Sequence, residues 1–587
     1  IKFLQLEITR YNCYSIYKGG DDLEAVKKWY DNYPKEIPKS IPYDEKPLYA
    51  YLEETASRYP EKKALHFMGK EMSYAELSDQ AKKFANYLQS LGVEKDDKVA
   101  IMLPNCPQAV ISYYGILMAG AIVVQTNPLY TERELEYQVN DSEAKVIICL
   151  DILVPRVSKV QKKSNLEHKI VTAIKDYLPF PKNLIYPYIQ KREYNMVVKV
   201  EQSKDTHVWE NIMKTADSNY VKRDINPKED LALLQYTGGT TGFPKGVMLT
   251  HYNLVANLQM SEAWLYKSKP GEETVLAVLP FFHVYGMTTV MNFGIKQASK
   301  IILMPKFNPE DVLKVIDKQK PTLFPGAPTI YIGLLNHPDL KKYDLSSIKA
   351  CLSGSAPLPI EVQEQFEKIS GGRLVEGYGL TETSPVTHAN PVWEKRINGS
   401  IGLPWPDTDA KVVRAGTDEE ADIGEVGEIA VKGPQVMKGY WNNPEETENV
   451  LRDGWFYTGD MGYMDEEGYF YIVDRKKDMI IAGGYNIYPR EVEEVLFEHP
   501  AIQEVAVVGV PDPYRGETVK AFVVVKEGKQ VTEDELNSFC RENLAAYKVP
   551  RSYEYREELP KTVVGKILRR QLIEEEVKKQ EDQLISE

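Results

Sequence analysis

The sequence has few cysteines, no long uninterrupted apolar run and fewer basic than acidic side chains. Its five cysteines are scattered, and none forms a Cys-x-x-Cys pair, which argues against a disulfide framework or structural zinc and favours a reducing compartment. Lys+Arg number 72 against 86 Asp+Glu, and the net charge of −14 argues against nucleic acid as a partner. Residues 1–20 lack the apolar region of a secretory signal, and we interpret them as an extension of uncertain origin.

The longest strongly apolar segment, Ala109–Val124, is shorter than the roughly 20 residues that a transmembrane helix requires. Gly115 and Gly120 interrupt it, and Pro107 precedes it as a helix-starting residue. We therefore predict a buried helix near 107–119 and a strand near 121–125. With 43% apolar and 27% charged residues, the composition is that of a globular protein with a substantial core.

The order of apolar patterns predicts several domain-sized units. Helical and strand patterns alternate from about residue 47 to 151 and again from 231 to 404, which predicts βα units around parallel sheets. Short strands and turns then predict a small β-rich subdomain. We predict an α/β fold with a large N-terminal body of several subdomains (21–476), a hinge at Lys477 and a small, mobile α+β C-terminal domain (478–587).

Residues 152–230 are more polar and irregular, and we interpret them as an insertion or long excursion from the sheet. Within them, Tyr177–Tyr188 is rich in aromatic residues and proline. Two interpretations stay open for this segment: a surface loop packed on the body, or a contact with a membrane surface.

A short apolar strand, Leu231–Tyr236, runs into a segment of glycine and threonine that ends with Lys245 and Gly246. Glycines let backbone N–H groups turn inward around an anion, the hydroxyls add donors, and the lysine adds positive charge. Gly246 stands where a Walker A loop requires Ser or Thr, so this is a polyphosphate cradle of another kind. The residues that we expect to bind phosphate are Thr237, Gly238, Gly239, Thr240, Thr241, Gly242 and Lys245.

Further motifs follow the phosphate loop in a fixed order, and together they cover the chain from about residue 50 to 570. They are PFFHVYGM at 280–287, GSAPL at 354–358, EGYGLTET at 376–383, YTGD at 457–460, DRKKD at 474–478, GGYN at 483–486 and PKTVVGK at 560–566. With the loop, this series resembles the acyl-adenylate-forming superfamily, which includes acyl-CoA synthetases, adenylation domains of peptide synthetases and beetle luciferases.

The resemblance implies a role for several residues of the motifs. Glu382, with Thr237, would ligate a Mg²⁺ ion that bridges ATP phosphates, an ion that prefers oxygen ligands. Tyr378 would lie against adenine, Asp460 would accept hydrogen bonds from the ribose hydroxyls, and Arg475 would reach the ribose or a phosphate. The other residues expected at the nucleotide and thiol sites are Ser355, Ala356, Glu376, Gly377, Gly379, Thr381, Lys477, Gly483 and Gly484.

By the same resemblance, Lys566 is the lysine of the adenylation step, where it would neutralise charge that builds between the carboxylate and the phosphate. His283 would border the carboxylate substrate and the adenylate. Val284, Tyr285 and Met287 suit an apolar tail, and the segment holds no acidic residue to pair with the ammonium group of an amino acid. Met287 stands where some long-chain members carry a tryptophan gate.

The chain most resembles bacterial long-chain fatty acid–CoA ligases, which implies that it uses ATP, Mg²⁺ and coenzyme A to convert a fatty acid through acyl-AMP into acyl-CoA. Three other activities stay open: a medium-chain or aryl-carboxylate CoA ligase, a luciferase-like oxygenase, and a non-catalytic acyl or nucleotide sensor. A sensor is expected to lack Lys566, Glu382 or Asp460, and all three are present. The expected location is cytoplasmic, with peripheral contact at the inner face of the membrane and a homodimer left open.

Overall fold

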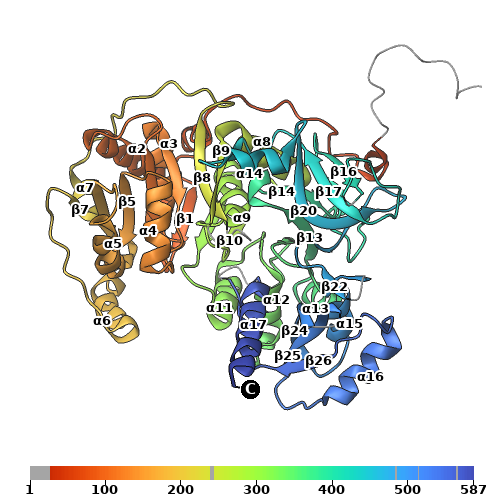
Figure 1. Ribbon diagram of the computed structural model, residues 1–587. Coiled ribbons are helices and arrows are strands. Elements are labelled where there is room, and N and C mark those ends of the chain that lie inside the picture. The colour runs from red at the N-terminus through yellow and green to blue at the C-terminus, as the bar shows by residue number, and fades with distance from the viewer. Residues whose placement is uncertain are drawn as a thin grey trace, which may run out of the picture.

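The computed structural model describes residues 27–237, 244–414, 416–482, 485–512, 515–562 and 566–586. The proposed extension 1–20 lies outside these residues. Figure 1 shows a large body that contains the N-terminal and central parts of the chain, and a smaller lobe below it that contains the C-terminal part.

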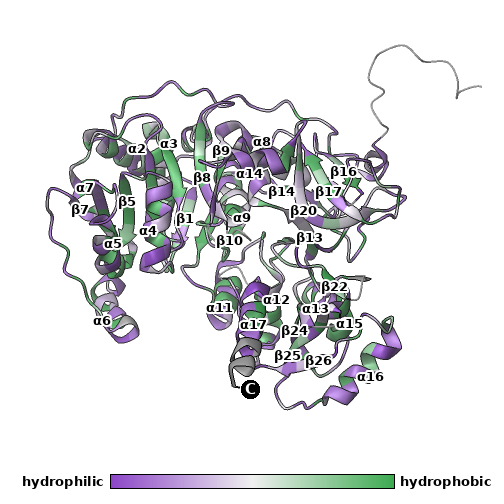
Figure 2. Ribbon diagram, in the orientation of Figure 1, coloured by the Kyte–Doolittle hydropathy of each residue, from purple (hydrophilic) through white to green (hydrophobic). Residues whose placement is uncertain are grey.

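The largest sheet of the described chain has eight strands in the order β18-β9-β8-β4-β3-β5-β6-β7. The strands from β8 to β7 pair in parallel, whereas β8 and β9 form an antiparallel hairpin. Figure 2 shows β5 and β8 in hydrophobic colours, as expected for strands covered on both faces. The strands are β3 (Lys98–Met102), β4 (Ile122–Gln125), β5 (Val146–Leu150), β6 (His168–Thr172), β7 (Thr206–Val208), β8 (Leu231–Thr237), β9 (Lys245–Thr250) and β18 (Gly439–Tyr440).

The predicted helix at 107–119 is confirmed as α3, every residue of which is buried, and the predicted strand that follows it is β4. Pro107 begins the helix, and Gly120 ends it with φ +84°, a left-handed conformation that glycine adopts without strain. The helices of this region are α1 (Ala50–Arg58), α2 (Tyr74–Ser90), α3 (Pro107–Ala119), α4 (Glu132–Asp141), α5 (Val154–Gln161), α6 (Lys182–Tyr194), α7 (Trp209–Thr215) and α8 (His251–Trp264).

The interpretation of residues 152–230 as an excursion from the sheet is wrong in part. β6 and β7 lie in this region and extend the largest sheet at its β5 edge. Both strands are short and carry polar residues such as His168, Lys169 and Thr206, because they form the end of the sheet. α6 and the segments around it remain an excursion between these two strands.

Two smaller sheets lie beside the first and are joined through single bridges from Leu323 to Val275 and Ala350. One has the order β10-β11-β1-β2 and the other β12-β13-β14-β15. Their strands are β1 (Lys63–Phe67), β2 (Lys70–Ser73), β10 (Thr274–Ala277), β11 (Lys300–Leu303), β12 (Ala350–Ser353), β13 (Arg373–Gly379), β14 (Val386–Ala389) and β15 (Leu403–Pro404), and their helices are α9 (Val284–Gly286), α10 (Phe293–Lys296), α11 (Pro309–Gln319), α12 (Pro328–Leu335) and α13 (Ile360–Ser370).

The predicted β-rich subdomain after residue 404 is an antiparallel sheet in the order β16-β17-β20-β19, with β21 paired to β20. One of these pairings sets Asp460 directly opposite Arg475 on the neighbouring strand. The elements are β16 (Asp409–Val413), β17 (Gly427–Lys432), α14 (Pro444–Val450), β19 (Leu451–Arg452), β20 (Trp455–Met464) and β21 (Phe470–Arg475).

The C-terminal part contains a sheet in the order β23-β22-β25-β24, with β26 paired to β25. Its buried apolar side chains form two clusters separate from the cluster of the large body. Its elements are β22 (Ile480–Ala482), β23 (Tyr485–Ile487), α15 (Pro489–Phe497), β24 (Ile502–Asp512), β25 (Gly516–Val525), α16 (Glu533–Asn543), β26 (Ser552–Tyr555) and α17 (Arg569–Ser586).

Among the described residues, no helix combines the length and the apolarity needed to cross a bilayer. Four of the five cysteines are described; all four are buried and free.

Candidate active site

The phosphate loop joins β8 to β9, and its two ends are fixed by the sheet. Thr237 lies directly opposite Lys245 in the antiparallel pairing of these strands. β8 pairs in parallel with β4, so the loop leaves the carboxyl end of a buried strand, where ligands commonly bind in α/β proteins. Gly238, Gly239, Thr240, Thr241 and Gly242 lie outside the described residues.

Lys245, expected to contact phosphate, forms an ion pair with Glu446 of α14. Its ammonium group also lies 5.2 Å from the centroid of the Tyr440 ring. The side chains of Lys245 and Glu446 are 13% and 29% exposed, so the pair is partly shielded from water. The sequence analysis missed Glu446, because no motif connects it with a lysine some 200 residues earlier in the chain.

Glu382, the expected metal ligand, lies in a turn of 3₁₀ helix, Thr381–Thr383, after β13. The Tyr440 hydroxyl donates a hydrogen bond to Glu382 Oε1 at 2.8 Å, and burial raises the pKa of this carboxyl group. Tyr440 is also paired with Val247 of β9. Tyr440 therefore links Glu382 to the β8–β9 hairpin that carries Thr237 and Lys245. This tyrosine connects the two segments that hold the expected metal ligands, Glu382 and Thr237.

Asp460, Tyr378 and Arg475 form a compact polar group. The Tyr378 hydroxyl donates to Asp460 Oδ2 at 2.6 Å, and Arg475 Nε lies 3.1 Å from Asp460 Oδ1. Asp460 is 3% exposed, and its negative charge raises the pKa of Arg475. The structure thus brings together the residues that the resemblance assigns to adenine (Tyr378), to the ribose (Asp460) and to the ribose or a phosphate (Arg475).

Lys566 belongs to the C-terminal part of the chain and lies beside this polar group of the large body. Burial, together with the positive charges of Arg475 and Lys477, lowers the pKa of Lys566 to about 7, against the opposing effect of Asp460. The pKa of His283 is lowered to about 4 by burial and by the charge of Lys566. Lys566 is therefore close enough to both the Asp460–Arg475 group and the histidine of the PFFHVYGM motif for their charges to interact.

His283 precedes α9, and its ring holds the first turn of that helix. The backbone N–H of Tyr285 donates to His283 Nδ1 at 3.2 Å. A nitrogen that accepts a hydrogen bond carries no proton, so the neutral ring carries its proton on Nε2. His283 can therefore donate one hydrogen bond from Nε2 at neutral pH.

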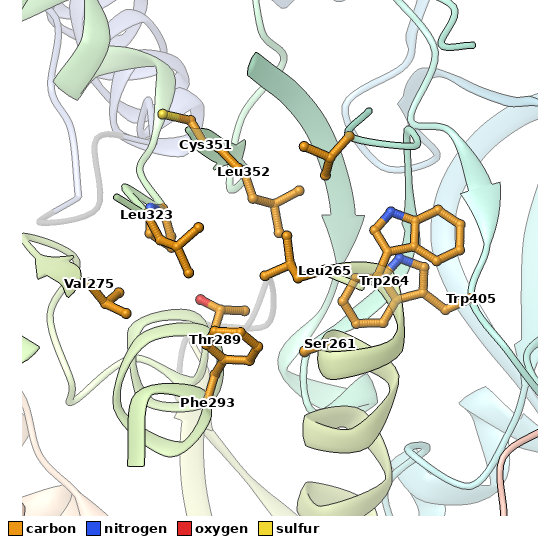
Figure 3. Close-up of a pocket in the computed structure, with 13 residues that line it drawn as sticks. Ser261, Trp264, Leu265, Val275, Thr289, Phe293, Leu323, Cys351, Leu352 and Trp405 are labelled. Atoms are coloured by element: carbon orange, nitrogen blue, oxygen red, sulfur yellow. The ribbon is translucent and has the colours of Figure 1, made fainter. Parts of the chain in front are cut away.

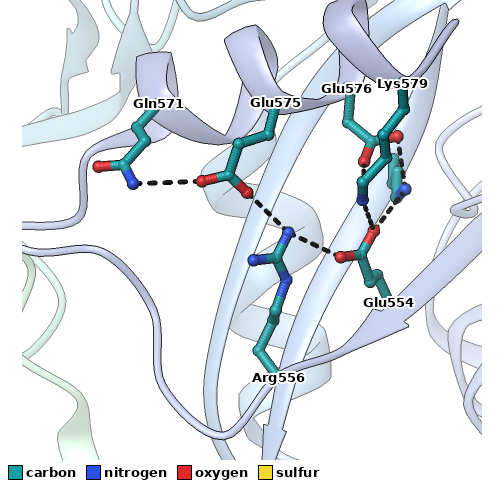
Figure 4. A network of polar contacts seen from close by, with 7 residues as sticks. Glu554, Arg556, Gln571, Glu575, Glu576 and Lys579 are labelled. Carbon is teal, nitrogen blue, oxygen red and sulfur yellow. Dashed lines mark hydrogen bonds and ion pairs between the residues drawn. The ribbon is translucent and has the colours of Figure 1, made fainter. Parts of the chain in front are cut away.

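The turn that carries Lys566 is held in place by α17 and by residues near the hinge. Arg569 pairs with Glu493 of α15 at 2.6 Å and with Asp478 at 3.7 Å. α17 is bound to the C-terminal sheet by the polar network in Figure 4, where Arg556 Nη2 donates to Glu575 Oε2 at 2.8 Å. Further contacts of this network include Lys520–Glu554, Lys520–Glu576 and Lys579–Glu554.

Glu376 of β13 is buried, and burial raises its pKa to about 7 although the charge of Arg490 in α15 opposes the change. It therefore faces the C-terminal part as well as the expected nucleotide site. Gly379 of the same strand permits a close approach, because a Cβ atom there would lie 2.0 Å from the Pro385 carbonyl oxygen.

The remaining expected residues occupy three loops. Ser355 and Ala356 follow β12, and Ser355 adopts φ +73°. Lys477 follows β21, where burial lowers its pKa. Gly377 lies in β13 and Thr381 in the turn after it, whereas Gly483 and Gly484 are outside the described residues.

An apolar pocket lies beside the PFFHVYGM segment (Figure 3). Trp264 and Trp405 stack along one side with ring centroids 5.7 Å apart, and Thr289 and Phe293 face them. The sequence analysis missed all four, since nothing in the sequence pairs two tryptophans so far apart. The other lining residues are Ser261, Leu265, Val275, Leu323, Pro325, Ala350, Cys351, Leu352 and Val392.

Val284, Tyr285 and Met287, expected to contact an acyl tail, are buried on the helical run that leads to this pocket, but they are not among its lining residues. The Tyr285 hydroxyl donates to the carbonyl oxygen of Leu352, a lining residue, at 2.7 Å. Tyr285 therefore supports the wall of the pocket from behind.

The chain is similar to known enzymes along most of its length. The profile of the AMP-binding enzyme family matches residues 52–441, and that of the AMP-binding enzyme C-terminal domain matches residues 491–566. A long-chain-fatty-acid–CoA ligase of Bacillus subtilis is 59% identical over 94% of this chain and 99% of its own length. A long-chain-fatty-acid–CoA ligase of Salmonella typhimurium is 42% identical over 94% of this chain and 98% of its own length.

Solved structures of other proteins share the fold of this chain. ATP-bound MatB from Rhodopseudomonas palustris is 30% identical, with a TM-score of 0.80 over 90% of this chain and 99% of its own. The anthranilate CoA ligase AuaEII in complex with anthranoyl-AMP is 28% identical, with a TM-score of 0.80 over 91% of this chain and 98% of its own.

Proposed function

Because the chain belongs to the AMP-binding enzyme family, we propose that it is an acid–thiol ligase that converts a long-chain fatty acid into its coenzyme A thioester through an acyl-adenylate. The observation that carries this proposal is the position of Lys566 beside Asp460, Arg475 and His283. The names of the relatives at 59% and 42% identity support the long-chain acid as substrate. The apolar lining of the pocket favours an aliphatic tail over a charged one.

In the first step, a carboxylate oxygen of the fatty acid attacks the α-phosphorus of ATP. A new P–O bond forms, the bond between the α- and β-phosphates breaks, and pyrophosphate leaves. Negative charge gathers between two anionic groups, so a buried cation at this point lowers the barrier. Lys566 supplies that cation. Tyr378 holds the adenine and Asp460 holds the ribose, so that the α-phosphate meets the carboxylate.

His283 is neutral at physiological pH because its pKa is about 4. Its Nε2–H donates to the fatty acid carboxylate and orients one oxygen toward the phosphate. A neutral donor suits this role, because a charged imidazolium would hold the carboxylate more tightly in the ground state and weaken its attack.

The residues fit a Mg²⁺ ion near the phosphates. Glu382 is half-buried and accepts a hydrogen bond from the neutral Tyr440 hydroxyl, which leaves carboxylate capacity for a hard cation. Glu382 and Thr237 would hold the ion, with the remaining ligands from phosphate and water. When bound, Mg²⁺ neutralises phosphate charge, and Lys245 contributes to the same end once it leaves Glu446.

In the second step, the thiol of coenzyme A loses its proton and attacks the acyl carbon. A C–S bond forms, and the C–O bond to AMP breaks. Lys566 is not needed here, so the C-terminal domain (478–587) turns about Lys477 and brings Gly483 and Gly484 to the thiol. A polar contact crosses this hinge, in which the Arg490 backbone N–H donates to Asp474 Oδ2 at 2.8 Å, and such a contact can break in a rotation.

We further propose a cytoplasmic location, which the free, buried cysteines of the described chain support. Of the two further partners expected from the sequence, a membrane surface is supported by exposed apolar side chains on α6. The homodimer follows from the resemblance, and light scattering in solution measures it.

The experiment that tests the proposal is pyrophosphate release by the purified protein with Mg·ATP and a panel of aliphatic and aromatic acids. Long-chain fatty acids should give the highest kcat/KM, and Lys566→Ala should abolish release with every acid. Lys578→Ala removes an exposed lysine of α17 and should leave release unchanged. Preference for an aromatic acid, or equal activity of Lys566→Ala, would contradict the proposal.

A further inference from the structure

α6 turns its apolar side chains toward solvent. Phe180, Leu184 and Tyr188 are spaced by four residues, so they form one stripe along the helix and the turn before it, and they are 80%, 62% and 78% exposed. Ile185 and Ile189 extend the stripe on one side. A surface helix normally buries its apolar face, and an apolar face in water marks an interaction site.

The opposite face of α6 is fixed to the body by half-buried and polar groups. Gln190 is buried and donates to Asp151 Oδ2 at 2.9 Å, and the Lys182 ammonium donates to the Met68 carbonyl oxygen at 2.8 Å. Tyr186 packs against the main apolar cluster. The apolar stripe is therefore held outward by specific contacts.

Two other segments add exposed apolar side chains beside α6. Met68, in the turn that Lys182 contacts, is 39% exposed. Phe307 is also 39% exposed, and its neighbour Lys306 pairs with Glu193 of α6 at 3.8 Å. We call the surface formed by these residues the α6 face; it consists of Met68, Phe180, Leu184, Ile185, Tyr188, Ile189 and Phe307.

The α6 face lies at one edge of the sheet that leads to the acyl site. Met68 follows β1 and Phe307 follows β11, and β1, β11 and β10 run in parallel as neighbours. The carboxyl end of β10 leads to His283, so the α6 face and the His283 segment lie at the same edge of this sheet. Figure 1 shows α6 at the lower left of the body and α11 at its lower side, nearer to the C-terminal lobe.

The charge around α6 differs from that of the chain as a whole. From Lys175 to Lys199 there are five basic and two acidic residues, whereas the whole chain has a net charge of −14. Lys191 and Arg192 are exposed in the last turn of α6, directly beside the apolar stripe. Apolar side chains flanked by basic ones match a bilayer that carries anionic headgroups.

We propose that the α6 face docks on an anionic lipid bilayer, with the stripe Phe180–Leu184–Tyr188 inserted among the lipids and Lys191 and Arg192 against the headgroups. This inference rests on the proposed function, because a long-chain fatty acid partitions into membranes. The α6 face also lies at the same edge of the sheet as the His283 segment, where the fatty acid is proposed to bind. The bilayer then supplies substrate to a protein that has no membrane-spanning helix among its described residues.

The test is co-sedimentation of the full-length protein with vesicles of phosphatidylcholine and phosphatidylglycerol in equal amounts. The variant Leu184→Ser/Ile185→Ser/Tyr188→Ser should lower the fraction of protein bound to vesicles about tenfold. The variant Lys191→Glu/Arg192→Glu should lower it by a similar factor, and the difference between this variant and the wild type should disappear in high salt. The matched control is Leu129→Ser/Val221→Ser/Ile423→Ser, which removes three exposed apolar side chains elsewhere and should bind as the wild type does.

Pyrophosphate release with detergent-dispersed palmitate should be the same in all these variants, so a failure of docking is distinguished from a failure of the proposed activity. Undiminished vesicle binding in both the serine and the glutamate variants would overturn the inference. So would a serine variant that changes the mass in light scattering but not vesicle binding, because the face would then be an interface between copies of the chain.

Discussion

Lys566 and His283 come from opposite parts of the chain, and the charge of the lysine helps to lower the pKa of the histidine to about 4. This relationship requires the C-terminal part to lie against the body. Burial and the charge of Arg475 leave Lys566 itself with a pKa of about 7.

Binding of ATP should therefore take up a proton. The pKa of Lys566 lies at about 7, below the usual 10.5, because burial and Arg475 disfavour its charged form. Phosphate charge favours the ammonium form and raises this pKa, so ATP affinity should fall as the pH rises above 7, by up to about tenfold per pH unit. Titration calorimetry at about pH 8 in two buffers of different ionisation enthalpy measures the uptake. Lys566→Met should abolish it; no uptake by the wild-type protein would contradict the assignment.

Glu446 should compete with ATP for Lys245. Glu446→Gln removes the ion pair and frees the lysine for phosphate, so KM for ATP should fall about threefold, a change expected for a partly exposed pair. Lys245→Gln should raise KM about tenfold, and the double variant should resemble Lys245→Gln, because the two residues act through one contact. Steady-state kinetics measures the cycle, and additive effects would show that the pair has no role in phosphate binding.

Thr289 should set how long an acyl chain the pocket accepts. Thr289→Phe fills space opposite Trp264 and Trp405, and excluding about four methylene groups at about 0.8 kcal/mol each should lower kcat/KM for palmitate about a hundredfold. The activity of Thr289→Phe with octanoate should change by less than about twofold, because the shorter chain does not need the space that is filled. The conservative variant Thr289→Ser should change the activities with palmitate and with octanoate by less than about twofold. An equal loss with octanoate and palmitate would remove the pocket from the acyl site.

Lys477→Pro should separate the two half-reactions. Proline restricts the backbone at the proposed hinge, so the arrangement seen here should persist and ATP–pyrophosphate exchange should continue, while thioester formation should fall about a hundredfold or more. Lys477→Ala, which removes the side chain but not the rotation, is the control and should retain both. Loss of exchange with retention of thioester formation would be the opposite of what a hinge at this position requires.

The sequence predicted those parts of the site that lie in one continuous segment each. Asp460, Tyr378, Arg475 and Lys566 were all named from their motifs, and the structure brings them together. Glu446, Tyr440 and the Trp264–Trp405 pair were missed because each acts through a tertiary contact with a distant residue. β6 and β7 were missed for a related reason, since short strands at the end of a sheet keep polar residues and lose the pattern of buried ones.

The apolar segment Tyr177–Tyr188 illustrates a different limit. Its composition favours a surface loop packed on the body and leaves a membrane contact open as the alternative. The exposure of Phe180, Leu184 and Tyr188 depends on which face of α6 meets the body, and that is decided by Gln190 and Lys182 through their contacts with Asp151 and Met68.

The central claim is that residues from both parts of the chain direct a fatty acid carboxylate onto the α-phosphorus of ATP. The most direct measurement uses palmitate labelled with oxygen-18 in its carboxylate, with Mg·ATP and coenzyme A, followed by mass spectrometry of the nucleotide and phosphate products. The account predicts one labelled oxygen in AMP and none in pyrophosphate. Unlabelled AMP, or label in inorganic phosphate with ADP as the nucleotide product, would contradict it.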